Sequence, residues 1–412
     1  MPSSRISSGL RRLVTTHRGA PSLPGGYACE VVRVLLSIHH PLDPNLSAPG
    51  VTLALANALE IAGCQVTTYG YQEAWPGLRA PSVKHALAFP YKTAGYLARN
   101  HHRFDVLDMS TGDAHWWPLA KKLGGDRPAL ITRSHGLEHL ADERLRTDAA
   151  RGTIRLSRKY GIYHGGLRLR EVARSLRASD GAIVLNDAER AYSINVIRMR
   201  PERVTVIPNG VDQAFLDSPS AKSVRGPLRL VWIARWHPSK GSLEMIEALD
   251  RLAGAGVAFH LLMLGTSLAE ENVLASLTER VRPHIAVMPQ FLKTELPALL
   301  ADREVFVLPS HSEGFSTALI EAMALGVTPV ATAVGGAPTL IVPNANGLLI
   351  PTHAATPLAD AISRLAADRD AAGMMGLRAM KTARDFTWDR VAERTMRWYQ
   401  QVRELMLVAT NR

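Results

Sequence analysis

Short runs of β-branched and apolar residues alternate with longer segments of helical periodicity from Val31 to the end of the chain. Strands and helices that alternate in this way build parallel sheets covered by helices on both faces, so the pattern predicts an α/β fold. In the first half, the predicted strands are residues 31–38, 65–70, 129–132, 181–185 and 204–207, and the predicted helices are residues 51–62, 113–123 and 167–177.

A segment of small and polar residues at 217–227 (DSPSAKSVRGP) interrupts this alternation, and we predict a linker there. The alternation then restarts. In the second half, the predicted strands are residues 228–234, 260–264, 285–288, 305–308 and 327–331, and the predicted helices are residues 242–252, 295–301, 317–325 and 357–366.

Two similar Rossmann-like, doubly wound halves that face a central cleft are the simplest architecture for this order of elements. A last helix at about residues 388–406 carries Trp388, Trp398 and Tyr399, and we expect it to pack on one half or across both. The predicted parts are a basic tail at residues 1–30, an N-terminal domain at 31–216, a C-terminal domain at 217–390 and a C-terminal helix at 391–412.

Composition is typical of a globular protein with an ample core, because 46% of the 412 residues are hydrophobic and 21% are charged. The apolar runs are shorter than the roughly 18 residues that cross a bilayer, so we predict no membrane-spanning helix. Cys29 and Cys64 are too few for a disulfide framework and lack the spacing of metal ligands. These features favour a reducing, cytoplasmic location.

The net charge of +11 is concentrated in two segments. Residues 1–29 contain four arginines and no acid, which fits a targeting segment, a flexible tail or a mis-assigned start codon. Residues 144–177 contain ten Lys and Arg residues against Asp148 and Glu171, interleaved with apolar residues. This second segment fits an anionic membrane surface, with the protein peripheral at the inner face of a membrane, and fits a solvated helix face equally well.

Residues 307–326 (VLPSHSEGFSTALIEAMALG) run from a strand through Glu313 into a helix that contains Glu321. The free amides of Gly314, Phe315, Ser316 and Thr317 are predicted to point out of the helix N-terminus, where a phosphate binds favourably. The two carboxylates suit sugar and ribose hydroxyls, which donate hydrogen bonds. The alternative is that Glu313 is an ordinary helix-start acid and Glu321 a solvated one.

Residues 230–241 (LVWIARWHPSKG) place Arg235 at the end of a strand and Lys240 at the start of a helix. Two cations at the carboxyl end of a strand predict an anion site, since a leaving diphosphate needs positive charge where negative charge develops. Surface charges are the alternative interpretation of both residues.

Two weaker signals lie in the first half. His135 and Gly136 follow a strand in the segment TRSHGLEH, and Gly50 ends the loop after the first strand, where a glycine lets the backbone approach a ligand closely. The alternative for His135 is an interior histidine whose hydrogen bonds are satisfied within the protein, and the alternative for Gly50 is an ordinary turn glycine.

Taken together, these residues resemble the retaining glycosyltransferases of the family-4 type, which have the GT-B fold. The resemblance runs from about Val31 to the final helix. Its pieces are the loop that ends at Gly50, His135 with Gly136, the IPNGVD turn at 207–212, Arg235 with Lys240, Glu313 with Glu321, and the NGLLIP turn at 346–351.

The resemblance implies a role for each matching residue. Catalytic roles fall to His135, near the anomeric carbon, and to Glu313, at the donor sugar hydroxyls. Arg235, Lys240 and Gly50 would line the donor diphosphate site. Glu321 would bind the ribose, and the loop from Gly314 to Thr317 the phosphates or the sugar. The chain departs from the family pattern at Thr339, where relatives commonly have Glu, and at residues 288–291 (MPQF) near the nucleobase.

The implied reaction transfers a hexose-type sugar from a nucleotide-sugar donor to an acceptor hydroxyl, with retention of anomeric configuration. The acceptor would be a glycan, a lipid-linked saccharide or a small molecule, bound by the N-terminal domain, as in polysaccharide biosynthesis. No metal or other cofactor is expected, because Arg235 and Lys240 neutralise the diphosphate.

Rival functions are a nucleotide-sugar epimerase, a glycoside phosphorylase and a non-catalytic protein that binds anions or nucleic acid. A Rossmann dehydrogenase is excluded because no Gly-x-Gly-x-x-Gly follows the first strand. Nucleic acid is not expected as a partner, since the sequence has no aromatic or helix-turn-helix signature for reading bases.

Overall fold

The computed structural model describes residues 31–117, 127–218 and 226–410. The residues from Val32 onward form one compact unit. The predicted tail at 1–30, and with it Cys29, lies outside the described residues, as do residues 219–225 of the predicted linker. Among the described residues, no helix combines the length and the apolar character needed to cross a bilayer.

The first half of the chain forms a six-stranded sheet in which every neighbouring pair is parallel, with the order β2-β1-β3-β4-β5-β6. Its strands are β1 (Arg33–Ser37), β2 (Gln65–Tyr69), β3 (Val106–Ser110), β4 (Ala129–Arg133), β5 (Gly181–Val184) and β6 (Val204–Val206). Alternate residues of these strands are buried on opposite faces. One face packs on α1 (Ser47–Ile61) and α16 (Trp388–Thr410), the other on α3 (Val83–Asn100) and α6 (Arg168–Ala178).

The second half forms another parallel six-stranded sheet, with the order β12-β11-β10-β7-β8-β9. Its strands are β7 (Leu228–Ile233), β8 (Phe259–Leu264), β9 (Ile285–Met288), β10 (Val305–Leu308), β11 (Thr328–Thr332) and β12 (Leu348–Ile350). One face packs on α9 (Ser242–Gly254) and α14 (Ala355–Ala367), the other on α11 (Leu296–Leu300) and α12 (Thr317–Ala324). The predicted pair of doubly wound parallel sheets is confirmed.

Further helices complete the described chain. They are α2 (Tyr71–Ala74), α5 (Glu138–Ala150), α7 (Asp187–Asn195), α8 (Gln213–Leu216), α10 (Glu270–Ala275), α13 (Ala337–Leu340) and α15 (Arg369–Ala383). The domain boundaries at 216 and 390 remain predictions, although the last strand of the first sheet ends at Val206 and the first strand of the second begins at Leu228.

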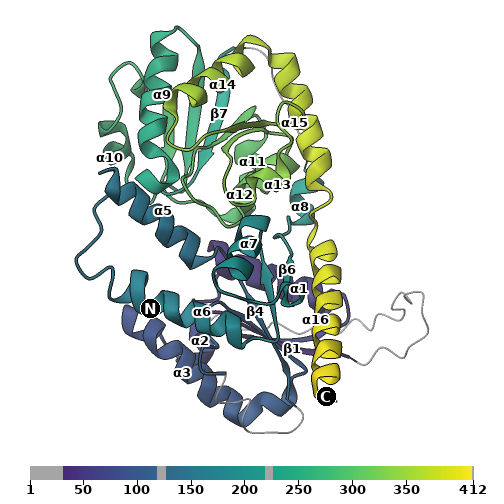
Figure 1. Ribbon diagram of the computed structural model, residues 1–412. Coiled ribbons are helices and arrows are strands. Elements are labelled where there is room, and N and C mark those ends of the chain that lie inside the picture. The colour runs from purple at the N-terminus through teal and green to yellow at the C-terminus, as the bar shows by residue number, and fades with distance from the viewer. Residues whose placement is uncertain (1–30, 118–126, 219–225, 411–412) are drawn as a thin grey trace, which may run out of the picture. The chain divides into compact units, whose positions relative to one another are not determined.

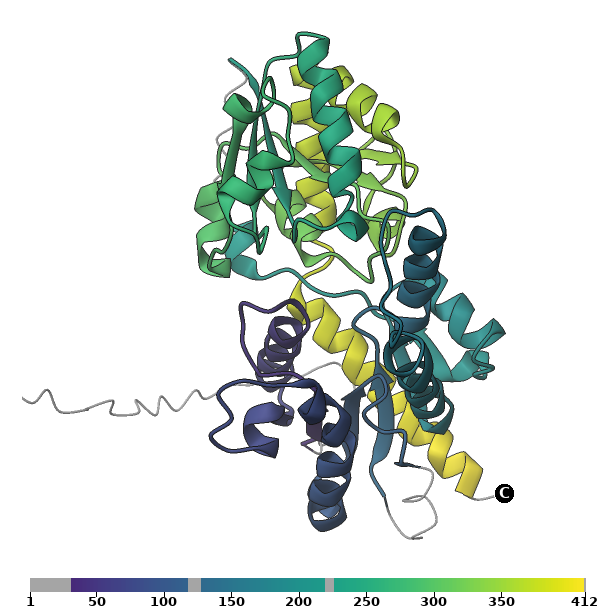
Figure 2. The same ribbon diagram turned by 90° about the vertical axis from the view of Figure 1, so that its left-hand side faces the viewer.

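The C-terminal helix α16 belongs by its packing to the first sheet. Val391, Tyr399 and Val402 join the core that includes Val34 and Ile183 of that sheet. The segment that leads back to the first sheet before α16 lies beside the segment that leaves it after β6, since the amide of Val211 donates to the carbonyl of Phe386 over 2.8 Å. In both views, α16 lies along the first sheet, whereas α14 and α15 lie with the second (Figures 1 and 2).

Every predicted strand is present within two residues of its predicted bounds, whereas β3 and β12 were not predicted. The buried Asp108 interrupts the apolar run of β3, and it is stabilised there by Arg133 and Tyr399. The helix predicted at 113–123 is wrong for residues 113–116, which form a turn, and residues 118–123 lie outside the described chain.

Candidate active site

The turn between β7 and α9 carries both predicted cations. Arg235 is exposed two residues after the end of β7, and Lys240 ends a short 3-10 turn, Pro238–Lys240. Gly241 then adopts a left-handed φ of 79°, and a Cβ at this position would lie 2.2 Å from the carbonyl oxygen of Pro309. Only glycine therefore allows the turn to pack against the segment that follows β10.

Lys240 contacts the loop between β10 and α12. Its Nζ donates a hydrogen bond to Oε1 of Glu313 over 2.6 Å, and both side chains are largely covered. Two predicted site residues from different loops thus form one ion pair. A charge-assisted bond of this kind fixes the positions of both groups, so a cation and a carboxylate lie together at the carboxyl ends of neighbouring strands β7 and β10.

The N-terminus of α12 lies directly after this ion pair. Ser316 caps the helix, and its side chain accepts a hydrogen bond from the amide of Leu319 over 3.3 Å. Within the described part of the chain, no hydrogen bond occupies the amides from Gly314 to Thr317. The ring of Phe315 is buried, and a Cβ on Gly336 would lie 2.4 Å from it. The side chain of Phe315 therefore packs in the core. The hydrogen-bond donors that it leaves to the loop are the backbone amides.

Glu321 has a different partner from Glu313. It is only 5% exposed and lies 3.2 Å from Nζ of Lys293, which also pairs with Asp212 at 2.8 Å. Burial raises the pKa of Glu321, and the charge of Lys293 opposes that rise. The amide of Lys293 donates to Asn45 over 3.3 Å, so this network also reaches the loop that precedes α1.

The first sheet contributes the loop after β4. Gly136 has a φ of 125°, and a Cβ on Gly314 would lie 2.6 Å from the Cα of Gly136. Asn186, which caps α7, donates its side-chain amide to the carbonyl of Gly314 over 2.9 Å. The loops after β4 and β5 therefore abut the loop that contains Glu313.

His135 lies in this contact region, next to Gly136. Burial lowers the pKa of its imidazole to about 3, and Arg133, His39 and His40 lower it further by charge repulsion. Its Nδ1 is buried without a hydrogen-bond partner among the described residues. The ring is therefore neutral at physiological pH and retains an unused polar atom.

A pocket of about 370 Å³ opens beside these loops. Glu143 and Arg144 of α5, Asn186, Glu313 and Gly335 are among the residues that line it. This volume is within the range of small-molecule sites, and Glu313 lines the pocket while its partner Lys240 does not.

Two family models match the chain. The one described as Glycosyltransferase Family 4 matches residues 50–215, and the one described as Glycosyl transferases group 1 matches residues 227–368. The first range contains every strand of the first sheet except β1, the second contains the whole second sheet, and together they contain every predicted site residue. The predicted resemblance to glycosyltransferases of the family-4 type is confirmed.

Curated relatives of this chain match over part of their length. WcaL of Salmonella typhimurium, named as a colanic acid biosynthesis glycosyltransferase, is 33% identical over 195 residues, which are 45% of this chain and 48% of WcaL. The D-inositol 3-phosphate glycosyltransferase of Mycobacteroides abscessus is 27% identical over 230 residues, 54% of this chain and 52% of the relative. The matches span about half the length of these relatives.

Solved structures support the GT-B fold over nearly the whole chain. Sucrose-phosphate synthase from Thermosynechococcus elongatus has a TM-score of 0.72 at 21% identity, with 91% of this chain and 100% of that one covered. HepE of Anabaena, solved in complex with UDP-glucose, has a TM-score of 0.62 at 17% identity and covers 91% of this chain and 99% of its own.

The loop that ends at Gly50 differs in detail from its prediction. In the structure, α1 begins at Ser47, so Gly50 lies in its first turn and not in the loop. A Cβ at Gly50 would lie 2.6 Å from the carbonyl oxygen of Pro44. The glycine thus permits a close approach of the chain's own backbone, and its predicted contact with the diphosphate remains untested.

Several polar residues near the carboxyl ends of strands were not predicted. Lys293 lies five residues after the end of β9, beyond residues 288–291. In the first sheet, His39 Nδ1 lies 2.9 Å from Asp113, and the buried Arg168, at the start of α6, donates to the carbonyl of Thr111 over 2.6 Å. The positions of His39 after β1 and of Asp113 after β3 were the available signal, but β3 itself was missed.

The basic segment at 144–177 is divided between structural and exposed cations. Arg168 is buried, and Arg146 pairs with Asp142 at 2.7 Å. Arg155, Arg158 and Lys159 are exposed, close in sequence to Ile162, which is 73% exposed. Arg151, Arg170 and Arg174 of the same segment are also exposed.

Proposed function

We propose that the protein transfers a hexose-type sugar from a nucleoside-diphosphate sugar to an acceptor hydroxyl, with retention of anomeric configuration. The observation that carries the proposal is the Lys240–Glu313 ion pair, which lies beside the unoccupied amides at the start of α12. Cation, amides and carboxylate are the groups needed to bind phosphate and sugar hydroxyls next to each other.

In this proposal, Arg235 and Lys240 bind the diphosphate together with the amides from Gly314 to Thr317. Arg235 is exposed and has no ion pair among the described residues, so its charge is available. Binding of the diphosphate to Lys240 would free the oxygens of Glu313 for the hydroxyls of the sugar. Glu321, held by Lys293, would accept hydrogen bonds from the ribose.

The transfer breaks the bond between the anomeric carbon and the diphosphate oxygen, and the acceptor oxygen forms a new bond on the same face of the sugar. The acceptor proton passes to an oxygen of the leaving phosphate. Arg235 and Lys240 stabilise the negative charge that develops there, so no metal is required for this step. The neutral His135 would form a hydrogen bond to the sugar near the reacting carbon.

Relatives support a nucleotide-sugar donor and a saccharide acceptor. HepE has been solved with UDP and with UDP-glucose, and WcaL is named for colanic acid biosynthesis. We therefore propose a role in polysaccharide biosynthesis in the cytoplasm, where nucleotide sugars are used.

The test is an activity assay of the full chain with UDP-, GDP- and ADP-sugars and a panel of saccharide acceptors. NMR of the product should show the anomeric configuration of the donor. Lys240→Met should lower kcat about a hundredfold or more, since it removes a charge at the leaving group. Arg251→Ala, which removes an exposed arginine from helix α9, the helix that follows Lys240, should leave kcat unchanged.

An inverted product would contradict retention, and an unchanged rate for Lys240→Met would contradict the assigned diphosphate site. Turnover that needs no acceptor would identify an epimerase. Turnover that requires free phosphate would identify a phosphorylase.

We also propose that the segment around Arg155, Arg158 and Lys159 contacts anionic lipid, which favours a lipid-linked acceptor. The exposed side chain of Ile162 supplies an apolar group beside these charges. Replacing the three cations by alanine should weaken sedimentation with phosphatidylglycerol vesicles. The matched control replaces three exposed cations elsewhere, Lys381, Arg384 and Arg397. Equal binding of the two triple variants would refute the contact.

A further inference from the structure

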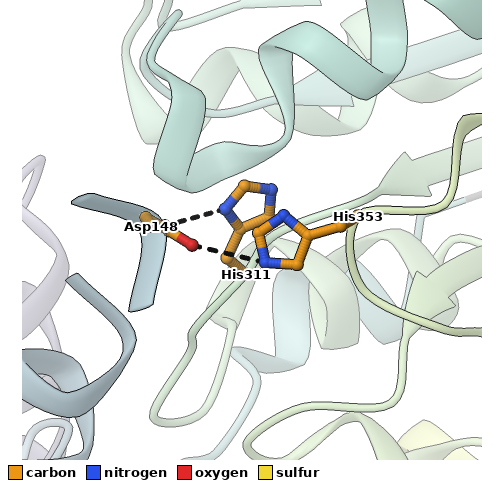
Figure 3. Close-up of side chains that lie close together, drawn as sticks. All are labelled: Asp148, His311 and His353. Atoms are coloured by element: carbon orange, nitrogen blue, oxygen red, sulfur yellow. Dashed lines mark hydrogen bonds and ion pairs between the residues drawn. The ribbon is translucent and has the colours of Figure 1, made fainter. Parts of the chain in front are cut away.

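Two histidines and two carboxylates from four separate elements meet in a buried cluster. Asp148 comes from α5, Glu244 from the first turn of α9, His311 from the loop after β10 and His353 from the loop after β12. The side chains of Asp148 and His311 are fully buried, and those of Glu244 and His353 are 10% and 12% exposed. Figure 3 shows both imidazoles beside the Asp148 carboxylate.

Each imidazole has one nitrogen near Asp148 and the other near Glu244. For His311, Nδ1 lies 2.9 Å from Asp148 and Nε2 lies 3.0 Å from Glu244. For His353, Nε2 lies 3.3 Å from Asp148 and Nδ1 lies 3.6 Å from Glu244. The two rings are 3.9 Å apart between their centroids.

Hydrogen bonds within the described chain do not satisfy this cluster. Asp148 Oδ1, Glu244 Oε2 and His353 Nε2 are buried without a hydrogen-bond partner. Two of these atoms, Asp148 Oδ1 and His353 Nε2, face each other at 3.3 Å. Buried polar atoms are rarely left unpaired, because they lose their hydrogen bonds to water, so the arrangement lacks a component.

A divalent cation supplies that component. One ligand atom each from Asp148, His311 and His353 lies within 4.8 Å of the others. Ligands bound to a tetrahedral Zn²⁺ at its usual bond lengths are about 3.3 Å apart. Imidazole nitrogens with a carboxylate oxygen form the donor set of Zn²⁺ and similar transition metals, and the ion also offsets the two buried carboxylates.

The position of Glu244 fits the same assignment. A histidine that ligates a metal through one nitrogen almost always donates from the other nitrogen to a carboxylate, a backbone carbonyl or a water, which fixes the orientation of the ring. Glu244 is placed to accept such a bond from His311, and it lies on the same side of the cluster as Nδ1 of His353.

The backbone of His353 also supports a specific use of its side chain. Its φ is 57°, in the left-handed region that favours glycine or asparagine. A histidine is held there at a cost, and its ring is directed into the cluster.

We propose that Asp148, His311 and His353 bind a structural divalent transition-metal ion, with the donor chemistry of Zn²⁺, and that Glu244 orients the two imidazoles. The ion would join α5 to the loop that contains Glu313, two residues after His311. It is separate from the sugar-transfer step, and its test is independent of the proposed donor.

The experiment uses the untagged full chain, freed of metal with a chelator and then titrated with ZnCl₂. Mass spectrometry of the metal content should show one Zn²⁺ per chain, and calorimetry should show a single binding event that raises the Tm. Cobalt(II) in place of zinc should give the visible absorption of a four-coordinate site, which nonspecific surface binding does not give.

His353→Asn removes one ligand while it keeps a residue suited to the left-handed backbone, so it should fold and bind Zn²⁺ at least tenfold more weakly. Glu244→Gln should weaken binding about 10- to 100-fold. His102→Asn, at an exposed position, is the matched control and should bind as the unaltered chain does. Equal Zn²⁺ affinity of His353→Asn and His102→Asn, or an unaltered chain whose Tm does not respond to Zn²⁺, would overturn the proposal.

Discussion

Single residues in the site owe their chemistry to burial and to nearby charges. His135 is the strongest case, since burial above all, with repulsion from Arg133, His39 and His40, lowers its pKa to about 3. A histidine in the unfolded chain titrates near 6.5. The native protein therefore keeps a neutral ring at pH values where the unfolded chain is protonated.

This difference predicts that the protein becomes less stable as the pH is lowered below about 6.5. Because the unfolded chain then binds a proton that native His135 does not, the free energy of unfolding should fall by about 2 kcal/mol between pH 6.5 and 5 from this residue alone. Urea unfolding at both pH values measures it. The fall in the free energy of unfolding should be smaller by this amount in His135→Asn than in the unaltered chain. In His102→Asn it should equal that of the unaltered chain. A parallel pH dependence for His135→Asn and the unaltered chain would contradict the assignment.

The types of residue in the site were predictable from the sequence, whereas most of their partners were not. Arg235, Lys240, Glu313 and Glu321 stand out because charged groups follow or flank predicted strands. Lys240 and Glu313 are 73 positions apart, so their ion pair follows only from the order of strands in the sheet. Lys293, the partner of Glu321, follows β9 with no motif around it.

Among the connecting elements, the turn between β7 and α9 depends on one glycine. Gly241 combines a left-handed φ with a close approach to Pro309, and Lys240 directly precedes it. The turn therefore couples the conformation of one glycine to the position of a site cation.

Gly241→Ala should destabilise the protein by about 2 kcal/mol or more, since both the backbone conformation and the contact oppose a side chain. Gly373→Ala is the matched control, because Gly373 lies in α15 with open space around it. This control should be neutral or stabilising by up to about 1 kcal/mol. Urea unfolding measures both, and equal stabilities would show that the turn relaxes freely.

Most strands were predictable from clean apolar runs, whereas β3 was missed because a polar residue is buried in it, and the three-residue β12 was also missed. The strands of the second sheet have nearly unbroken apolar runs, and each predicted strand is present. β3 contains Asp108, whose burial depends on Arg133 and Tyr399 from distant parts of the chain. Local sequence does not reveal such compensation.

For the molecule as a whole, the return of α16 to the first sheet is an organising feature. Tyr399 donates to Asp108 over 2.6 Å, and Asp108 also pairs with Arg133 at 2.6 Å. This buried network ties the C-terminal helix to β3 and β4. Burial and the adjacent carboxylate raise the pKa of the Tyr399 hydroxyl well above its usual value, so it remains a donor.

Tyr399→Phe should lower the free energy of unfolding by about 1.5–3 kcal/mol, the value of a hydrogen bond to a charged group. Tyr91→Phe, at a tyrosine that is 65% exposed, should have little effect. Urea unfolding at pH 7 compares the two. Equal stability of both variants would mean that α16 is held by its apolar contacts alone.

The donor site is tested most directly by thermal shift of the full chain with UDP, GDP, ADP and their sugars, because a ligand that binds only the folded state raises the Tm. We predict that one nucleotide series raises the Tm, that Arg235→Ala and Glu321→Ala each abolish the shift, and that Arg251→Ala retains it. A nucleotide-induced shift that survives both site substitutions would contradict the assignment of the donor to these loops.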